Sequence, residues 1–445
     1  MLRSIKTIFT AFMMLAIVVS FTGCSMFDFF AIDSLLKPPK LTGEKSELQQ
    51  AFESAVGTDI RLFTPLVGDN RGSYVIFDAN ADGNDEAVVF YSFNDNASVV
   101  HMHLLTQIDE KWESVDDLVG SGTDIYKVDF YNIDNSRMLE IGVVWSLDDS
   151  KKEKNLSVYR ISSLEPSSED ALNSLATIQM ADYSFCDVDG DNANELLYFY
   201  FGGASGVSAR LIDYDGLENT FLPLSEVSLP FQFSSLVQLA YDKAGNDIRF
   251  YVDCKYSADE YFSEIIIYSR DNDALYIPTH NNKYISSLSR RYCEVFCSDF
   301  DRDGYLDIPV HVDYDASYVL SDTEENETSL DFVNWLSYSD GIFNSRGKYF
   351  MNYSDGYALR IDTIIDKYYI VYDDVNNIVQ VRINDSADEN NIIFSLSCNT
   401  GDSVSIIPDG LLGDKNKNEY NVVVSAKGEA YSFTENFIRS LIVDL

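Results

Sequence analysis

Basic residues are scarce in this chain of 445 residues. Lysine and arginine together number 32, whereas aspartate and glutamate number 72, so the formal net charge is −40. Because nucleic-acid binding needs a basic face, this balance argues against DNA or RNA as a partner. An acidic excess of this size either collects cations or only keeps a surface protein dispersed, and composition leaves both open. Hydrophobic residues make up 46% of the chain, which is enough for a large core.

Cysteine and histidine are also rare, which limits both disulfides and catalytic chemistry. The chain has six cysteines and no Cys-x-x-Cys, so we expect the five after Cys24 to be buried free thiols. Of the four histidines, His101 and His103 have the spacing that projects to one side of a strand, where two imidazoles can bind zinc. No third ligand is evident, and we expect both to face solvent. The chain has no Gly-x-Ser-x-Gly, phosphate loop or His-Glu-x-x-His, so the sequence identifies no catalytic residue.

Only one long hydrophobic run is present, and it lies at the start of the chain. Two basic residues precede the uncharged stretch 7–21, which has the charge and length of a secretory signal and is shorter than the ~20 apolar residues of a membrane span. The sequence that follows, Phe21-Thr22-Gly23-Cys24, resembles the bacterial lipobox. The resemblance implies that residues 1–23 are removed and that Cys24 is lipidated. The mature protein is then anchored to the extracellular face of a bacterial cell membrane.

Residues 24–57 are expected to form a tether followed by one short helix. Two consecutive prolines stiffen the tether, and Thr42 can cap the helix that follows. Leu48, Phe52 and Val56 share one face, and Gly57 is a stop signal. We expect the apolar face to pack on the main domain.

Everything after about residue 60 has the pattern of β-strands, in which short runs of Val, Ile, Tyr and Phe alternate with Asn, Asp and Gly. Three turns share a nine-residue template, with Asp at positions 1 and 5, Asn or Asp at position 3 and an acid at position 9. A hydrophobic strand follows each turn at once. Position 6 is glycine or asparagine, which best tolerate the left-handed backbone of a tight turn. The three loops are 78–86 (DANADGNDE), 187–195 (DVDGDNANE) and 299–307 (DFDRDGYLD).

Alternating acids in a tight turn indicate a calcium site. Calcium takes about six to eight oxygen ligands, and three or four carboxylates this close repel one another without a cation. An EF-hand is excluded because it needs a Glu at position 12. That position holds Val89, Tyr198 and Val310, which lie inside the following strands. The template therefore predicts a nine-residue β-loop that holds calcium.

The spacing of the loops indicates an internal repeat. Position 9 falls at Glu86, Glu195 and Asp307, in steps of 109 (195 − 86) and 112 (307 − 195), and a degenerate copy places Glu140 between the first two. A period of about 55 residues with several strands per unit is typical of a propeller. We therefore predict an all-β fold with a short N-terminal helix, in which a β-propeller has about seven four-stranded blades. Residues 58–345 form its repeats, and residues 346–445 form either the last blades or a separate small C-terminal β domain beside five to six blades.

The acidic loops, each leading into a hydrophobic strand, resemble the FG-GAP and VCBS repeat families, which include the calcium-binding blades of integrin α-subunit propellers. FGGASG (201–206) is similar to the Gly-Ala-Pro element of these repeats, and 35–91 looks like the opening of VCBS-type lipoproteins. The resemblance covers 35–310 and implies a cell-surface propeller with about three calcium sites. The implied ligands are Asp78, Asn80, Asp82, the Asn84 carbonyl and Glu86; Asp187, Asp189, Asp191, the Ala193 carbonyl and Glu195; and Asp299, Asp301, Asp303, the Tyr305 carbonyl and Asp307.

The loops are not expected to bind equally. The first supplies three carboxylates from these positions and the other two supply four each, so we expect the first to bind calcium most weakly. Degenerate loops at 132–140 and 239–247 lack enough oxygen ligands, and we expect them to stay empty.

Three functions remain open at this stage. The first is a non-catalytic binding or scaffold lipoprotein that recognises an extracellular protein or glycan. The second is a surface enzyme that acts on polysaccharide, because paired carboxylates are abundant and a propeller funnel can host such chemistry. In the third, the metal sites only stabilise the fold and the last hundred residues carry the function.

Overall fold

The computed structural model describes residues 44–147, 154–168, 170–202, 206–230, 234–281, 289–315, 317–320, 330–339, 341–365, 367–373, 375–385, 388–399 and 419–445. The predicted signal peptide 1–23, Cys24, the tether and Thr42 lie outside these residues. No helix in the described ranges is long and apolar enough to cross a membrane.

The N-terminal helix α3 (Glu44–Val56) forms where the sequence predicts it and packs on the first sheet. Leu48 and Phe52, one turn apart, are fully buried. The ring of Phe52 meets that of Tyr91 edge-on, with 5.4 Å between ring centroids. Gly57 follows the helix with φ 91°, in the left-handed region that commonly ends helices. The predicted apolar face and stop signal are therefore confirmed.

The first sheet is an antiparallel meander of five strands, in which two short strands pair with different parts of the same neighbouring strand. β1 and β2 both pair with one edge of β3, while β4 and β5 continue from its other edge. Its elements are β1 (Ile60–Leu62), β2 (Tyr74–Phe77), β3 (Glu86–Phe93), the 3-10 turn η1 (Asn94–Asn96), β4 (His101–Ile108) and β5 (Lys111–Val119).

Three four-stranded meanders follow, in which each strand pairs antiparallel with the next one along the chain. Short polar connections suit this topology, because consecutive antiparallel strands need only a tight turn between them. The second sheet contains β6 (Asp124–Tyr131), β7 (Glu140–Ser146), β8 (Lys154–Ile161) and β9 (Leu172–Met180). The third contains β10 (Asp182–Cys186), β11 (Glu195–Phe201), β12 (Val207–Asp215) and β13 (Thr220–Ser228). The fourth contains β14 (Ser235–Ala244), β15 (Asp247–Lys255), β16 (Tyr261–Ser269) and β17 (Ala274–Tyr276), followed by η2 (Pro278–Asn281).

The last two sheets have five strands each and interleave along the chain. The C-terminal strand β27 returns to the fifth sheet and pairs with β22, and β19 runs parallel to β23 in the sixth. The fifth sheet contains β18 (Asp307–His311), β20 (Asp331–Ser339), β21 (Ile342–Asn352), β22 (Tyr357–Arg360) and β27 (Ile442–Asp444). The sixth contains β19 (Ser317–Leu320), β23 (Tyr369–Asp373), β24 (Ile378–Arg382), β25 (Ile392–Asn399) and β26 (Glu419–Val424), with η3 (Glu389–Asn391) between β24 and β25. Two short helices, α5 (Ala426–Ala430) and α6 (Glu435–Arg439), follow β26.

Neighbouring sheets pack face to face, which explains why the strands after the acidic loops are hydrophobic without interruption. On β11, Leu196 and Tyr198 pack toward the second sheet, whereas Leu197 and Phe199 pack toward the fourth. A strand whose two faces are both buried needs apolar residues at every position. The same arrangement joins the first sheet to the second, the fourth to the fifth and the fifth to the sixth.

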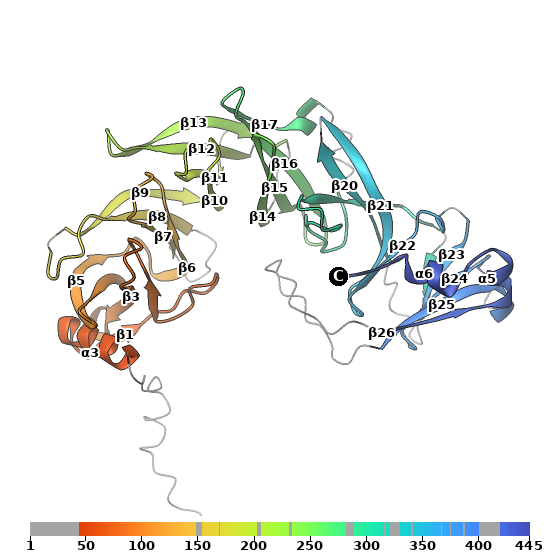
Figure 1. The fold of residues 1–445 in the computed structure, drawn as a ribbon, viewed down its shortest axis with the longest axis horizontal. Helices are drawn as coiled ribbons and strands as arrows, with labels where there is room; N and C mark the ends of the chain where they lie inside the picture. Colours follow the sequence, from red (N-terminus) through yellow and green to blue (C-terminus); the bar gives the residue numbers. More distant parts are fainter. Residues whose placement is uncertain are drawn as a thin grey trace, which may run out of the picture.

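The six sheets follow one another in chain order along an arc (Figure 1). The all-β prediction and the short N-terminal helix are confirmed, and the succession of face-packed sheets is compatible with a propeller. The number of blades stays a prediction. The five cysteines in the described ranges are free and buried, as expected: Cys186, Cys254, Cys293, Cys297 and Cys398.

Candidate metal centres

The acidic loops occupy one topological place in the fold. Loop 78–86 joins β2 to β3, and loop 187–195 joins β10 to β11. Loop 299–307 leads into β18 from Ser298, which forms an isolated bridge with Asp307. The first two loops each connect an edge strand to the next strand of its sheet, and the third connects the Ser298 bridge to β18. In all three, the closing acid is the first residue of the strand that follows the loop.

Backbone N–H groups hold the acids of each loop in a fixed pattern. In loop 299–307, Asp301 accepts from the N–H of Asp303 at 3.2 Å, and Asp303 accepts from the N–H of Tyr305 at 3.0 Å. Asp299 accepts from the N–H of Gly304 at 3.0 Å. The bonds accepted by positions 3 and 5 recur in the other two loops at 2.7–3.1 Å. The pattern turns alternate side chains toward the inside of the loop.

The backbone needs left-handed residues at two places in each loop. The predicted position 6 has φ between 74° and 89° in Gly83, Asn192 and Gly304. Position 4 is left-handed as well, at Ala81 (58°), Gly190 (87°) and Arg302 (61°). The sequence pattern did not predict the left-handed backbone at position 4, because alanine and arginine rarely adopt this conformation.

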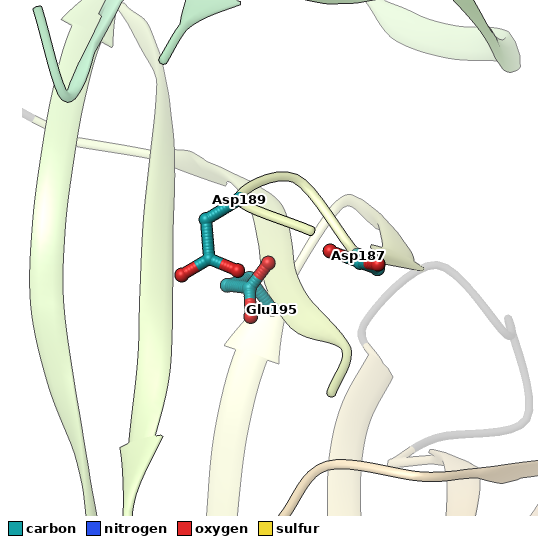
Figure 2. Close-up of side chains that lie close together, drawn as sticks. All are labelled: Asp187, Asp189 and Glu195. Atoms are coloured by element: carbon teal, nitrogen blue, oxygen red, sulfur yellow. The ribbon is translucent and has the colours of Figure 1, made fainter. Parts of the chain in front are cut away.

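In loop 187–195, the carboxylates of Asp187, Asp189 and Glu195 come together (Figure 2), with ligand oxygens within 4.8 Å of one another. Asp191, the fourth predicted acid, is exposed and lies outside this cluster. Glu195 is only 1% exposed. Burial and the charges of Asp189, Asp213 and Asp191 raise the pKa of Glu195 to about 7. A cation would relieve this repulsion.

Asp213 of β12 is a further acid at this site that the sequence did not reveal. It comes directly after Ile212, which pairs with Leu196, the neighbour of Glu195. Burial and the charges of Asp189 and Asp191 raise the pKa of Asp213. Only the register between β11 and β12 places it there, and that register is not readable from the spacing of the loop.

In loop 299–307, the carboxylates of Asp299, Asp301 and Asp303 form a second cluster within 4.8 Å. The closing acid Asp307 is 1% exposed, and within the described residues neither of its side-chain oxygens accepts a hydrogen bond. Burial and the charge of Asp301 raise the pKa of Asp307 to about 7, although Arg346 opposes the shift.

Arg346 of β21 is the positive charge nearest to this second cluster. Its Nη2 lies 2.5 Å from Asp303, and its Nε lies 3.4 Å from Asp301 and 3.8 Å from Asp307. Even with Arg302 of the loop counted, two guanidinium groups against four carboxylates leave an excess of two negative charges.

Loop 78–86 differs from the other two because its closing acid has hydrogen bonds at both oxygens. Both oxygens of Glu86 accept hydrogen bonds, from the N–H of Ala79 at 2.8 Å and from the hydroxyl of Thr106 at 2.9 Å. Asn80 donates its side-chain amide to Asp82 at 3.0 Å. The acids here do not converge within 4.8 Å as the other two sets do. The structure therefore supports two acidic clusters with metal-binding geometry where the sequence predicts about three.

The two histidines considered for zinc share one carboxylate. Nδ1 of His101 lies 2.8 Å from Asp117, and Nδ1 of His103 lies 3.0 Å from its other oxygen. The prediction that both histidines face solvent was wrong for His103, which is 3% exposed and packs against Phe52 of α3. Ser114 lies 3.0 Å from Nε2 of the same ring, which completes a serine–histidine–aspartate chain of bonds. Phe52 packs against the imidazole, so the buried ring of His103 helps to join the helix to the sheet.

Comparisons with known proteins add no function. No family model matches the chain, and no curated protein matches its sequence. Among solved structures, it is similar to a hypothetical selenium-binding protein of Sulfolobus tokodaii, with 9% identity, a TM-score of 0.31 and coverage of 47% of this chain and 54% of that one. This chain thus matches only about half of that protein's length. It is also similar to a proposed 6-phosphogluconolactonase of Bacteroides fragilis, with 13% identity, a TM-score of 0.32 and coverage of 82% and 97%.

Proposed function

We propose that this protein is a calcium-binding β-propeller lipoprotein, anchored through Cys24 to the extracellular face of a bacterial membrane. It acts there as a non-catalytic binding or scaffold module for a protein or a glycan. The observation that carries the calcium assignment is Asp307, a buried carboxylate that accepts no hydrogen bond within the described residues and stands beside three clustered aspartates. Buried carboxylates need a counter-charge, and clusters built from oxygen donors suit a hard cation such as calcium.

The repeated loop supports the propeller. The same turn joins the first two strand positions in the first, second, third and fifth sheets. A unit that recurs at one connection, in sheets that pack face to face, is the mark of a repeat architecture. We propose about seven blades, with five to six blades and a small C-terminal β domain as the alternative. An experimental structure of the mature protein decides between them.

Calcium has a structural part in this proposal. Extracellular modules often bind it with dissociation constants of about 10⁻⁴–10⁻³ M, so external calcium keeps such sites filled. Bound ions would hold the acidic loops rigid at the edges of consecutive sheets. A rigid rim is a suitable frame for recognition, because a preordered surface loses less entropy when a ligand binds.

A small hollow beside the third loop gives the proposed ligand a location. Its volume is about 280 Å³, and it shares Asp301 with the acidic cluster, so calcium there would affect the shape of the hollow. Aromatic and charged side chains together suit a polar ligand with apolar faces, such as a sugar. The lining residues are Phe300, Asp301, Arg302, Tyr349, Val443 and Asp444.

The anchor and the binding role are tested separately. Cells that express the full chain are compared with cells that express Cys24→Ser, by fractionation and by protease treatment of intact cells. The proposal expects the wild type on the outer surface of the membrane and the variant released. An unchanged membrane fraction for the variant contradicts the lipid anchor.

The purified mature protein is then screened for binding to glycans and cell-wall polysaccharides in calcium and in chelator. We expect calcium-dependent binding that Arg302→Asn weakens, since asparagine keeps the left-handed backbone of that position while it removes the charge. Product analysis of the same polysaccharides tests the enzyme alternative. Release of shortened chains contradicts a non-catalytic role.

A further inference from the structure

Loop 132–140 of the second sheet shares part of the backbone pattern of the acidic loops although it lacks two of their acids. Asn135 at position 4 is left-handed, with φ 58°. Asp134 at position 3 accepts from the N–H of Ser136 at 2.9 Å, and Glu140 at position 9 is 1% exposed. Positions 1 and 5, which are aspartates in the three acidic loops, carry an amide and a hydroxyl here. The turn thus shares the position-4 conformation and the position-3 hydrogen bond of the acidic loops, although it has half of their carboxylates and no left-handed residue at position 6.

A guanidinium lies between the two acids that remain. Nη2 of Arg160, on β8, is 2.7 Å from Asp134 and 3.2 Å from Glu140, and Nε donates to the same Glu140 oxygen at 3.2 Å. Nη1 donates to the hydroxyl of Tyr214 in the third sheet at 2.6 Å. The guanidinium also lies 4.6 Å from the centre of that tyrosine ring. The arginine is therefore held on several sides and is not a mobile surface charge.

The strand register places Arg160 across from the closing acid. It follows Tyr159, which pairs with Ile141, the neighbour of Glu140. The three acidic loops carry no positive charge at this place. Thr106 pairs with Glu86 in the first sheet, and Ser337 pairs with Asp307 in the fifth. In the third sheet the equivalent residue is Asp213, which follows Ile212, the residue that pairs with Leu196.

The charges distinguish this loop from the others. In loop 132–140, the two carboxylates with Arg137 of the loop and Arg160 sum to −2 + 2 = 0. The four carboxylates of loop 299–307 with Arg302 of the loop and Arg346 sum to −4 + 2 = −2, and the oxygens of Asp307 still lack hydrogen-bond donors among the described residues. Two arginines therefore neutralise the second-sheet loop, whereas two arginines leave the acidic loop short of positive charge.

We propose that Arg160 takes the place of the metal ion in the second sheet, so that the residue across from the closing acid decides which loops of this fold require a cation. The inference rests on the proposed calcium binding by the acidic loops. The sequence predicts only that this degenerate loop binds no calcium. The inference adds that the guanidinium of Arg160 is a permanent internal cation in the loop. It also implies that an acid in place of Arg160 creates a new calcium site there.

Arg160→Asp tests this directly, since it copies the acid that stands at the equivalent place in the third sheet. The matched control is Arg210→Asp on β12, the third strand of the next sheet. Arg210 pairs with Glu226 at 2.7 Å and lies 5.0 Å from the ring of Tyr200, but it faces no acidic loop. Melting midpoints of the wild type and both variants are measured in calcium and in chelator. Bound calcium is counted by mass spectrometry of the metal after gel filtration.

Arg160→Asp is expected to melt below Arg210→Asp in chelator, to gain more from calcium than the wild type does, and to bind one additional ion per chain. Equal calcium-induced shifts and equal ion counts in wild type and both variants overturn the inference. If Arg160→Asp does not fold in either condition, Arg160→Gln decides, and a calcium-induced shift no larger than that of the wild type overturns it. A wild type that shows no calcium response contradicts the proposed function, whereas a responsive wild type with Arg160 variants that respond no more than it does contradicts only the role of Arg160.

Discussion

The backbone N–H of Val188 donates to Oε2 of Glu195 at 2.7 Å and so ties the end of the acidic loop to its beginning. Glu86 and Glu140 accept the same bond from position 2 of their own loops. Asp307 accepts none in the described part of the chain, because its side chain is one methylene shorter. In three loops the closing acid thus links the two ends of the loop by a hydrogen bond. In the fourth it is a buried carboxylate that has no hydrogen-bond donor among the described residues.

Glu195→Gln is expected to change stability with opposite signs in the two metal conditions. Burial and the charge of Asp189 raise the pKa of Glu195 to about 7, so at pH 8 its ionised form is costly in the absence of a cation. In chelator the variant should melt at or above the wild type. In calcium it loses a ligand and should melt a few degrees lower. Differential scanning calorimetry at pH 8 measures both midpoints. Glu226→Gln is the control, and a change of the same sign in both conditions for Glu195→Gln refutes the prediction.

Calcium affinity should differ among the loops. Both oxygens of Glu86 are already hydrogen-bonded, and loop 78–86 does not bring its acids together as the other two do. Asp82→Asn is therefore expected to remove the weakest site, and Asp189→Asn or Asp301→Asn a tighter one. Titration calorimetry on the three single variants separates the sites. Equal affinities for the three lost sites are incompatible with this ranking.

Asp117→Asn should destabilise the protein at neutral pH by about 1–3 kcal/mol, because it replaces a carboxylate that accepts three side-chain hydrogen bonds with a neutral amide. Burial favours the neutral acid, but the bonds from His103, His101 and Tyr91 outweigh it and hold the pKa of Asp117 below its usual value. A carboxyl whose folded-state pKa is lowered stabilises the fold above its unfolded pKa of about 3.9. That contribution disappears as the pH falls through the lower folded value. The difference in unfolding free energy between wild type and variant should therefore shrink below about pH 4. A difference that stays constant down to pH 3 contradicts this assignment.

Phe52→Ala should cost about 3–5 kcal/mol, because it leaves a cavity under α3 where the phenyl ring is fully buried. The ring also covers His103 at a centroid distance of 5.5 Å, so the variant should expose the imidazole to solvent. Urea unfolding measures the first effect, and the rate of solvent exchange at the His103 imidazole, followed by NMR, measures the second. Gln50→Ala, at an exposed position of the same helix, is the control. A loss no larger than that of the control means that α3 is not docked as described.

The loops were predictable from sequence because their chemistry is local. Alternating acids and a left-handed residue at position 6 lie within nine residues, and a turn of that size forms from its own hydrogen bonds. The hydrophobic strands that follow were predictable for the same reason.

The partners of the loops were not predictable, because they depend on register between strands. Asp213 lies 18 residues after Glu195, and Arg160 lies 20 residues after Glu140 (213 − 195 and 160 − 140). A shift of one residue would point either side chain to the other face of its sheet. His103 meets Asp117 in a pair of strands whose register shifts between Leu104 and Leu105. A β-bulge of this kind changes which residues share a face, and simple alternation cannot anticipate it.

The most direct test of the central claim is the melting midpoint of the mature wild-type protein in about 10 mM calcium, in the same concentration of magnesium and in chelator. At ten to a hundred times the dissociation constant, each occupied site adds about 1.4–2.7 kcal/mol to the stability of the folded state. The account predicts a midpoint several degrees higher in calcium than in chelator, with magnesium giving less because it prefers a smaller octahedral shell. The same midpoint in all three solutions would contradict it.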